Sequence, residues 1–269
     1  MSDDLEVISA CKVCGAQDLE DIYPSSWVRQ CRACGYVFRS TRATQEAISR
    51  FYSREGKYAH WLTELDARDP CFRYRLRRLR RFIPAGRLLD VGAGIGEFLH
   101  HAGRFFEVTG TEVSDEAVRL SREEFGIELL KGTLAEANLA AGSFDVVSLI
   151  HVLEHVQDPA DTVACCKGLL RPGGWLFVAV PNDSPTGWYK LVGGARRTLR
   201  RLIRRNVSKI SYRETPPFGS VDLRAVDTMA EIHLSHFSPE SLHFLLSRSG
   251  FETVYVGPDP CYTTTGFNR

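Results

Sequence analysis

Four cysteines near the start of the chain have the spacing of a metal site. They form two Cys-x-x-Cys pairs, each followed by glycine, with 16 residues between the pairs: Cys11, Cys14, Cys31 and Cys34. Four thiolates on two tight turns suit tetrahedral zinc, and the glycine after each pair permits the left-handed backbone that such a turn needs. Because four protein ligands leave no open coordination position, the sequence predicts a structural zinc ribbon over residues 1–42.

A glycine-rich loop later in the chain has the pattern of a cofactor-binding turn. It follows an apolar stretch and comprises Asp90, Gly92, Ala93, Gly94 and Gly96. Alternating glycines let the backbone turn sharply and approach a ligand closely, and the start of the helix that follows favours a bound carboxylate. Glu112, at the end of the next apolar stretch, can accept hydrogen bonds from two ribose hydroxyls. Nicotinamide-dependent dehydrogenases usually place the third glycine three residues after the second, whereas here the interval is two.

Alternating strand and helix patterns must position this loop. Strands are predicted at residues 87–91, 108–113, 127–130, 144–150 and 175–180. Helices at 95–102, 114–125 and 159–170 lie between them, which is typical of a parallel sheet with crossover helices. We therefore expect a doubly wound, Rossmann-like α/β domain over residues 85–269, preceded by a helical linker at 43–84 that covers the cofactor pocket. A helix at 239–249 and a strand at 252–256 would close the domain.

Composition places the chain among globular proteins of near-neutral charge. It has 269 residues, 43% of them hydrophobic, and its 34 basic and 33 acidic residues give a formal net charge of +1. This balance argues against a nucleic-acid partner. The start of the chain lacks the basic and apolar regions of a signal peptide, and no apolar stretch is long enough to cross a membrane. We expect a cytoplasmic protein, in which cysteines are thiols or metal ligands.

The region from about residue 87 to residue 256 resembles class I S-adenosylmethionine-dependent methyltransferases. The similarity is strongest to the small-molecule O-methyltransferases of bacterial sugar, polysaccharide and quinone pathways. It rests on six motifs, which lie at Leu89–Gly96, Gly110–Glu112, Phe144–Val147, Leu153–Val156, Leu170–Gly174 and His236–Leu242. A zinc ribbon in front of such a domain also resembles some sugar methyltransferases.

The resemblance implies S-adenosylmethionine as the cofactor and a place for each part of it. The glycine loop would hold the methionine part. The other cofactor-binding residues would be Glu112 with its neighbour Val113 at the ribose, Thr133 and Leu134 at the adenine, and Ile150 and His151 in the pocket wall. Many relatives carry an acid at position 133, so Thr133 would replace that adenine contact only in part.

Transfer of a methyl group to a hydroxyl requires a group that removes the proton, and histidine suits this role at neutral pH. The candidates are His151, His155, His233 and His236. In quinone-pathway relatives two glutamates and a histidine form a divalent-metal site at the positions of His151, Glu154 and His155. Histidine in place of the first glutamate weakens a site for magnesium, which prefers oxygen ligands.

Residues 182–230 interrupt the alternation of strands and helices and are predicted to form an insertion or lid. Within it, residues 196–205 carry six arginines around an apolar stripe, and Trp188 and Tyr189 precede them. Such a segment can cover the active site, lie on an anionic membrane surface through residues 186–206, or hold RNA. A second basic run, Arg73 to Arg81, supplies packing residues and one phosphate contact.

The sequence thus predicts an S-adenosylmethionine-dependent enzyme that methylates an oxygen of a small molecule, such as a sugar, a nucleotide-sugar or a glycoconjugate. A phosphate-bearing or lipid-linked acceptor, with peripheral membrane contact, would fit the basic insertion. Two alternatives remain at this stage. One is an RNA methyltransferase that holds RNA with the ribbon and the arginines, and the other is a non-catalytic zinc-ribbon scaffold with a vestigial cofactor pocket.

Overall fold

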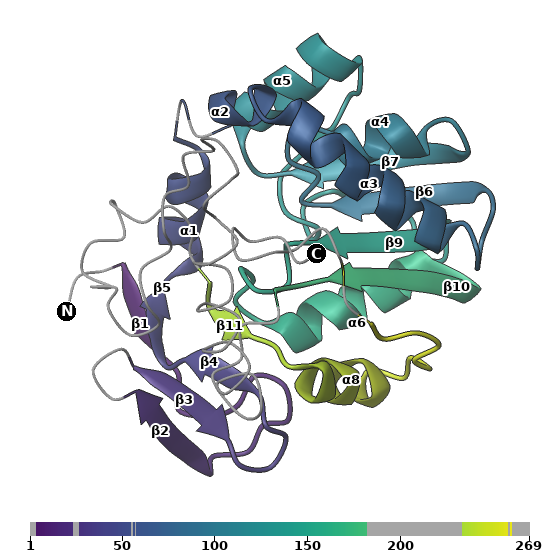
Figure 1. Cartoon of the computed structure of the whole chain (residues 1–269). Helices are drawn as coiled ribbons and strands as arrows, with labels where there is room; N and C mark the ends of the chain where they lie inside the picture. The colour runs from purple at the N-terminus through teal and green to yellow at the C-terminus, as the bar shows by residue number, and fades with distance from the viewer. Residues whose placement is uncertain are drawn as a thin grey trace, which may run out of the picture.

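A five-stranded parallel sheet forms the centre of the molecule (Figure 1). The computed structural model describes residues 4–23, 27–54, 56, 58–181, 233–257 and 259. The strands are β6 (Gly86–Val91), β7 (Phe106–Glu112), β8 (Leu130–Lys131), β9 (Phe144–Ile150) and β10 (Leu170–Ala179). Their order across the sheet is β10-β9-β6-β7-β8, and every pairing is parallel. This arrangement confirms the predicted Rossmann-like class.

The sheet is buried on both faces because its strands are apolar at consecutive positions. Leu89 of β6 and Val147 of β9 belong to a core cluster with α6 (Pro159–Leu169) and α8 (Pro239–Arg248). Leu88 and Val146, one position earlier in each strand, belong to a second cluster with α3 (Leu65–Leu79) and α4 (Glu97–Ala102). Successive side chains of a strand point to opposite faces, so these two clusters mark the two helical layers.

Local capping fixes where the helices begin. Ser114 accepts a hydrogen bond from the amide of Ala117 at the start of α5 (Asp115–Phe125), and Asp158 caps α6 in the same way. At the start of α8, Ser238 forms a reciprocal capping box with Ser241. Caps of this kind stabilise a helix by about 1 kcal/mol each.

The predicted linker contains three helices among its described residues, α1 (Gln45–Tyr52), α2 (Ala59–Leu62) and α3.

A small antiparallel sheet precedes the central sheet in sequence. It comprises β2 (Leu19–Tyr23), β3 (Val28–Cys31), β4 (Val37–Arg39) and β11 (Ser235–His236), in the order β11-β4-β3-β2. Beside it, β1 (Leu5–Val7) pairs with β5 (Thr41–Ala43). The strand β11 comes from almost 200 residues further along the chain, just before α8. The ribbon is therefore joined to the catalytic domain by backbone pairing (Figure 1).

One predicted element is wrong. Residues 251–257 contain no strand, and the side chains of Val254, Tyr255 and Val256 are exposed. An apolar alternating pattern forms a strand only beside a paired strand, and none lies next to this stretch among the described residues. The predicted insertion at 182–230 lies outside the described residues, and so does the basic segment 186–206. In the part of the chain that the structure covers, no helix has the length and apolar character to span a membrane.

Candidate active site

The glycine loop turns tightly between β6 and α4. Gly92, Gly94 and Gly96 all have positive φ angles, which favour glycine. A Cβ atom added to Gly94 would lie 2.7 Å from the ring of Trp61, and one added to Gly92 would lie 2.7 Å from the side chain of Val152. The loop therefore needs glycine for its backbone conformation and for the close approach of its neighbours.

Glu112 ends β7 beside this loop and is 4% exposed. Its carboxylate accepts a hydrogen bond from the amide of Gly94 at 2.9 Å and one from the amide of Ser114 at 2.9 Å. These two amides fix the orientation of the carboxylate, which accepts and never donates when ionised and so suits hydroxyl donors. The predicted ribose ligand thus also anchors the glycine loop to the start of α5.

Asp90 lies at the end of β6 and is fully enclosed. The hydroxyl of Ser148 in β9 donates a hydrogen bond to Asp90 Oδ1 at 2.6 Å. Burial raises the pKa of Asp90 to about 7, although the hydrogen bond from Ser148 opposes this shift. The side chain ties the base of the glycine loop to the neighbouring strand.

Trp61 in α2 covers the glycine loop, and the sequence analysis did not identify it. The guanidinium of Arg68 lies 3.9 Å from the centroid of the Trp61 ring, and it also pairs with Glu97 at 2.7 Å. Glu97 is the first residue of α4, directly after the loop, and burial raises its pKa to about 7. The predicted role of the helical linker as a cover of the cofactor pocket is consistent with this chain of contacts.

The two residues predicted to contact the adenine, Thr133 and Leu134, lie in the loop after β8. Both the amide and the hydroxyl of Thr133 donate to Glu136 Oε2, at 2.7 and 2.8 Å. Leu134 packs against the core cluster of the sheet. Val113 follows β7 and is partly buried. An acid is therefore present near position 133 after all, three residues further along, and sequence spacing alone did not point to it.

Histidines gather after β9. His155 and His233 lie with their ring centroids 4.9 Å apart, and the hydroxyl of Tyr52 contacts His155 Nδ1 at 2.9 Å. The amide of His155 donates to the carbonyl of Val152 at 2.9 Å, and the side chain of Val152 lies against Gly92, so the turn that carries His155 borders the glycine loop. His236 lies in β11 and is 3% exposed, and its ring centroid is 6.5 Å from that of His233. The structure thus brings His155, His233 and His236 into one row of rings, with His236 buried in the ribbon sheet.

His151 has a different role from its neighbours, because both of its ring nitrogens are occupied. Nε2 faces the guanidinium of Arg75 at 3.1 Å and Nδ1 faces Glu154 Oε1 at 3.1 Å. An arginine only donates, so Nε2 accepts and the proton lies on Nδ1, which donates to Glu154. Burial, followed by the Arg75 cation, holds the pKa of His151 well below its usual range. His151 is therefore neutral, and both of its ring nitrogens are engaged.

The same cluster could hold a metal ion. Ligand atoms of Glu154, His155 and His233 all lie within 4.8 Å of one another. One carboxylate and two imidazoles form a donor set that suits first-row transition ions and zinc better than magnesium. The predicted trio of His151, Glu154 and His155 is replaced here by a trio in which His233 takes the place of His151.

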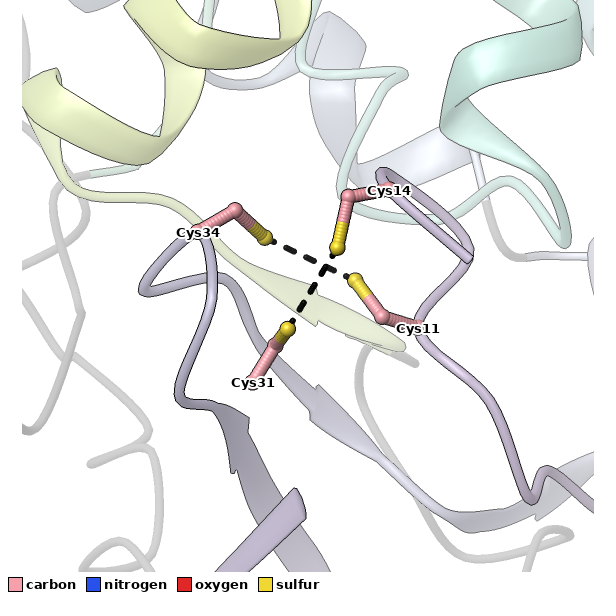
Figure 2. Close-up of side chains that lie close together, drawn as sticks. All are labelled: Cys11, Cys14, Cys31 and Cys34. Carbon is pink, nitrogen blue, oxygen red and sulfur yellow. Dashed lines mark hydrogen bonds between the residues drawn. The ribbon is translucent and has the colours of Figure 1, made fainter. Parts of the chain in front are cut away.

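The four ribbon cysteines converge on one point (Figure 2). Cys11 Sγ lies 3.6 Å from Cys34 Sγ, and Cys14 Sγ lies 3.5 Å from Cys31 Sγ. Zinc–sulfur bonds of about 2.3 Å in a tetrahedron hold the sulfurs about 3.8 Å apart, so the cage fits zinc. The amide of Val13 and the thiol of Cys34 bond to Cys11 and lower its pKa, which favours the thiolate that a metal needs.

The knuckle geometry agrees with the glycine after each cysteine pair. The amides of Gly15 and Gly35 donate to the carbonyls of Cys11 and Cys31 at 2.8 Å each, and both glycines have positive φ angles. These turns bring the two sulfurs of each pair to the same side. The four-cysteine cluster was predicted from spacing alone, and its geometry is confirmed.

A parallel sheet of this order, with a glycine loop after β6 and an acid at the end of β7, defines the class of Rossmann-like methyltransferases. A family model described as a methyltransferase domain matches residues 58–256. The chain belongs to this family, which confirms the class predicted from the motifs.

Named relatives share the central part of the chain. A ubiquinone biosynthesis O-methyltransferase of Bordetella avium is 33% identical over 138 residues, which cover 48% of this chain and 56% of the relative. The corresponding protein of Nitrosococcus oceani is 38% identical over 123 residues, covering 43% of this chain and 52% of the relative. The chain thus spans about half the length of the curated relatives it matches.

Solved structures resemble the chain more distantly. An S-adenosylmethionine-dependent methyltransferase of Thermotoga maritima superposes with a TM-score of 0.48 and is 20% identical, with 78% of this chain and 82% of that chain covered. A sugar N-methyltransferase of a Streptoalloteichus species has a TM-score of 0.38 and 24% identity, with 43% of this chain and 49% of that chain covered.

Proposed function

We propose that this protein transfers the methyl group of S-adenosylmethionine to an oxygen atom of a small molecule. One observation carries the proposal: the turn that carries His155, which contacts His233, lies through Val152 against Gly92 of a glycine loop that is anchored by Glu112. This arrangement provides a cofactor cradle next to groups that can take up a proton. In-line transfer from the sulfonium then requires mainly that the acceptor oxygen is held in position and deprotonated.

The proton passes to the histidine pair. His151 cannot accept it in the observed arrangement, because Arg75 occupies Nε2 and Nδ1 already carries a proton. His155 is oriented by Tyr52, and His233 packs against its ring. Glu154 lies 3.9 Å from His155 Nε2 and would stabilise the imidazolium that forms.

The acceptor is a small molecule with a free hydroxyl. The named relatives act in ubiquinone biosynthesis, which supports a hydroxyl on a precursor of that pathway as the first acceptor class to test. A sugar or glycoconjugate hydroxyl, predicted from the resemblance, is the second class. A phosphate-bearing or lipid-linked acceptor, with membrane contact through residues 186–206, remains part of the proposal and is tested by vesicle binding.

The ribbon carries one structural zinc ion on Cys11, Cys14, Cys31 and Cys34. The fit of the sulfur cage to tetrahedral zinc supports this assignment. Plasma emission analysis of the purified protein should give one zinc per chain. A chain that is folded and contains no zinc after expression in zinc-supplemented medium would remove the assignment.

Calorimetric titration with S-adenosylmethionine and S-adenosylhomocysteine, with NAD as the control, tests the cofactor. Micromolar binding of the first two and no binding of NAD is expected. Mass spectrometry of acceptor screens then shows whether a phenolic or a sugar hydroxyl gains a methyl group. Cofactor binding without turnover on any acceptor would favour a scaffold, and salt-sensitive methylation of RNA would favour the nucleic-acid alternative.

A divalent ion at Glu154, His155 and His233 is a second use of the same cluster, favoured by the proximity of their ligand atoms. Measuring the metal content of the purified protein distinguishes a bound ion from a proton-accepting role of the cluster. One zinc per chain means that only the ribbon is filled, whereas a second bound transition ion, lost in His233→Ala, would assign the ion to this cluster.

A further inference from the structure

A groove lies between α3 and α4, the two helices that cover one face of the central sheet. No step of methyl transfer uses this groove. The two helices run next to each other across that face (Figure 1). The groove has a volume of about 460 Å³, and its walls carry Arg73, Arg77 and Arg80 from α3 and the turn after it, and Arg104 from the turn after α4. This volume lies in the range of small-molecule sites. We call it the arginine groove.

The charge of the groove is unbalanced. Its single carboxylate, Asp69, contacts Arg73 at 3.2 Å and His101 at 3.1 Å. Burial lowers the pKa of His101, which favours its neutral form. Arg77 and Arg104 are exposed, and among the described residues neither makes an ion pair. Four guanidiniums and one carboxylate give the groove a charge of about +3, in a chain whose total is only +1.

Exposed arginines elsewhere in the described part of the chain commonly have acidic partners. Arg119 pairs with Glu123 at 2.5 Å, and Arg122 pairs with Glu128 through two hydrogen bonds. A cluster of arginines with few acidic partners is therefore not typical of the described surface. Like charges that face one another repel, and an anion between them relieves the repulsion.

The groove also offers fixed geometry and an apolar floor. The guanidinium of Arg80 lies 3.4 Å from the centroid of the Phe105 ring, and its Nε donates to the carbonyl of Pro84 at 3.3 Å. Phe105 remains 39% exposed, and Leu76 lines the groove beside it. A planar guanidinium held in this way matches two oxygens of a phosphate group.

The position of the groove separates it from the cofactor site. Arg104 and Phe105 directly precede β7, which begins at Phe106, so they lie at the amino edge of the sheet. The glycine loop follows β6 at the opposite, carboxyl edge. A ligand in the groove would therefore not compete with the cofactor, and this inference does not rest on the proposed function.

We propose that the arginine groove binds a ligand that carries two or more phosphate groups, with Arg77 and Arg104 gripping it from the two walls. One phosphate group balances only part of a charge of about +3, and a small carboxylate balances less. The volume is too small for a nucleic-acid duplex but accommodates a triphosphate, or a lipid headgroup with two phosphates, together with an apolar part against Phe105. The phosphate chemistry is common to both sources.

Calorimetric titration of the full chain with sodium tripolyphosphate at low salt tests the proposal. The double variant Arg77→Gln/Arg104→Gln should bind at least about 10-fold more weakly than the wild type, because it loses two charged hydrogen-bond donors to the phosphates. The matched control Arg119→Gln/Arg122→Gln removes the same charge from α5 and should keep the affinity of the wild type. Binding of S-adenosylmethionine should be equal in all three proteins, which verifies their folding.

A parallel arm uses vesicles that contain cardiolipin, a lipid whose headgroup carries two phosphates, with phosphatidylcholine vesicles as the blank. Loss of vesicle binding only in the groove variant identifies a lipid headgroup as the source of the phosphates. Tripolyphosphate binding without vesicle binding identifies a free phosphate ligand, and both results support the groove. The proposal is overturned if the wild type binds neither probe, or if the groove and control variants lose binding equally.

Discussion

The side chain of Arg39 in β4 donates a hydrogen bond from Nε to the backbone carbonyl of His233, at 3.1 Å. Next to this contact, the hydroxyl of Tyr36 bonds to the hydroxyl of Ser235, and both residues are fully buried. His233 belongs to the proposed proton-accepting pair, so the ribbon holds one half of that pair in place. We therefore expect the ribbon to influence the active site by positioning the backbone of residues 233–235, at a distance from the cysteines themselves.

Replacing Cys34 with serine should abolish zinc binding and lower methyl transfer together. Without the metal, β4 loses its support, and the contacts of Arg39 and Tyr36 with residues 233–235 weaken. We expect the turnover rate to fall at least about 10-fold, because small displacements of a catalytic group have large effects. The affinity for S-adenosylmethionine should change little, since the glycine loop is on the other sheet.

Cys165→Ser is the matched control for this experiment. Cys165 is exposed on α6 and is not part of the four-cysteine cluster. It should retain zinc, turnover and cofactor affinity. If Cys34→Ser lost zinc and kept full turnover, the ribbon would have no influence on His233.

Sequence patterns predicted those features that depend on neighbouring residues. The turn at Gly94 and the knuckle at Cys11 are specified within a few positions, because their glycines and ligands are close in the chain. The parallel sheet also followed from local alternation. What failed was the strand at 252–256, since a strand depends on a partner whose position the pattern does not contain.

Contacts between distant segments could not be predicted. The two-residue strand β11 carries no strand pattern, and only its pairing with Val37 and Phe38 makes it one. Arg75 is one of several arginines in α3, and nothing in the run indicates that this one is buried against His151. Which of these residues is buried or paired depends on how the helices pack on the sheet, and the local sequence does not contain this information.

His155→Gln should reduce turnover by roughly 100- to 10,000-fold, the usual contribution of a general base. Glutamine approximates the size of the ring and keeps a hydrogen bond with Tyr52, so the affinity for S-adenosylmethionine should remain the same. Rapid-quench measurement of the transfer step at saturating acceptor gives the rate. His243→Gln, an exposed histidine on α8, should behave as the wild type. A wild-type rate in His155→Gln would shift the base to another group.

Glu112→Ala should weaken the binding of S-adenosylmethionine by about 1–3 kcal/mol, or roughly 5- to 160-fold in the dissociation constant. The variant loses the proposed ribose contacts and also the anchors to Gly94 and Ser114. Glu112→Gln keeps one acceptor oxygen and should fall between the alanine variant and the wild type. Glu124→Ala, on the exposed side of α5, is the control, and equal affinities in all four proteins would refute the assignment.

A comparison of Gly94→Ala with Gly126→Ala separates the effect of backbone strain from the effect of a steric contact with Trp61. Both glycines have positive φ angles, but an added Cβ meets the Trp61 ring at 2.7 Å only at Gly94, whereas nothing lies within 4 Å at Gly126. Both variants should lose about 1 kcal/mol of folding stability. Only Gly94→Ala should also bind S-adenosylmethionine more weakly, as titration calorimetry would show. A similar loss of affinity in Gly126→Ala would mean that strain alone explains the effect.

The pH dependence of stability should reveal the buried carboxyl of Asp90. Its pKa is raised from 3.8 to about 7 in the folded chain, so the folded state holds the proton more tightly than the unfolded state. Between these two values unfolding releases a proton, and stability falls as the pH rises, by at most about 1.4 kcal/mol per pH unit. Above about pH 7 both states are ionised and this contribution no longer changes.

Asp90→Asn should reduce that slope because asparagine does not titrate. Urea unfolding of the wild type, Asp90→Asn and the exposed control Glu124→Gln at pH values from about 5 to about 8 would measure it. Glu97, whose pKa burial also raises to about 7, contributes a second proton, so the slope of Asp90→Asn should fall without vanishing. If Asp90→Asn and the wild type had the same slope, Asp90 would be ionised throughout, and the hydrogen bond from Ser148 would outweigh its burial.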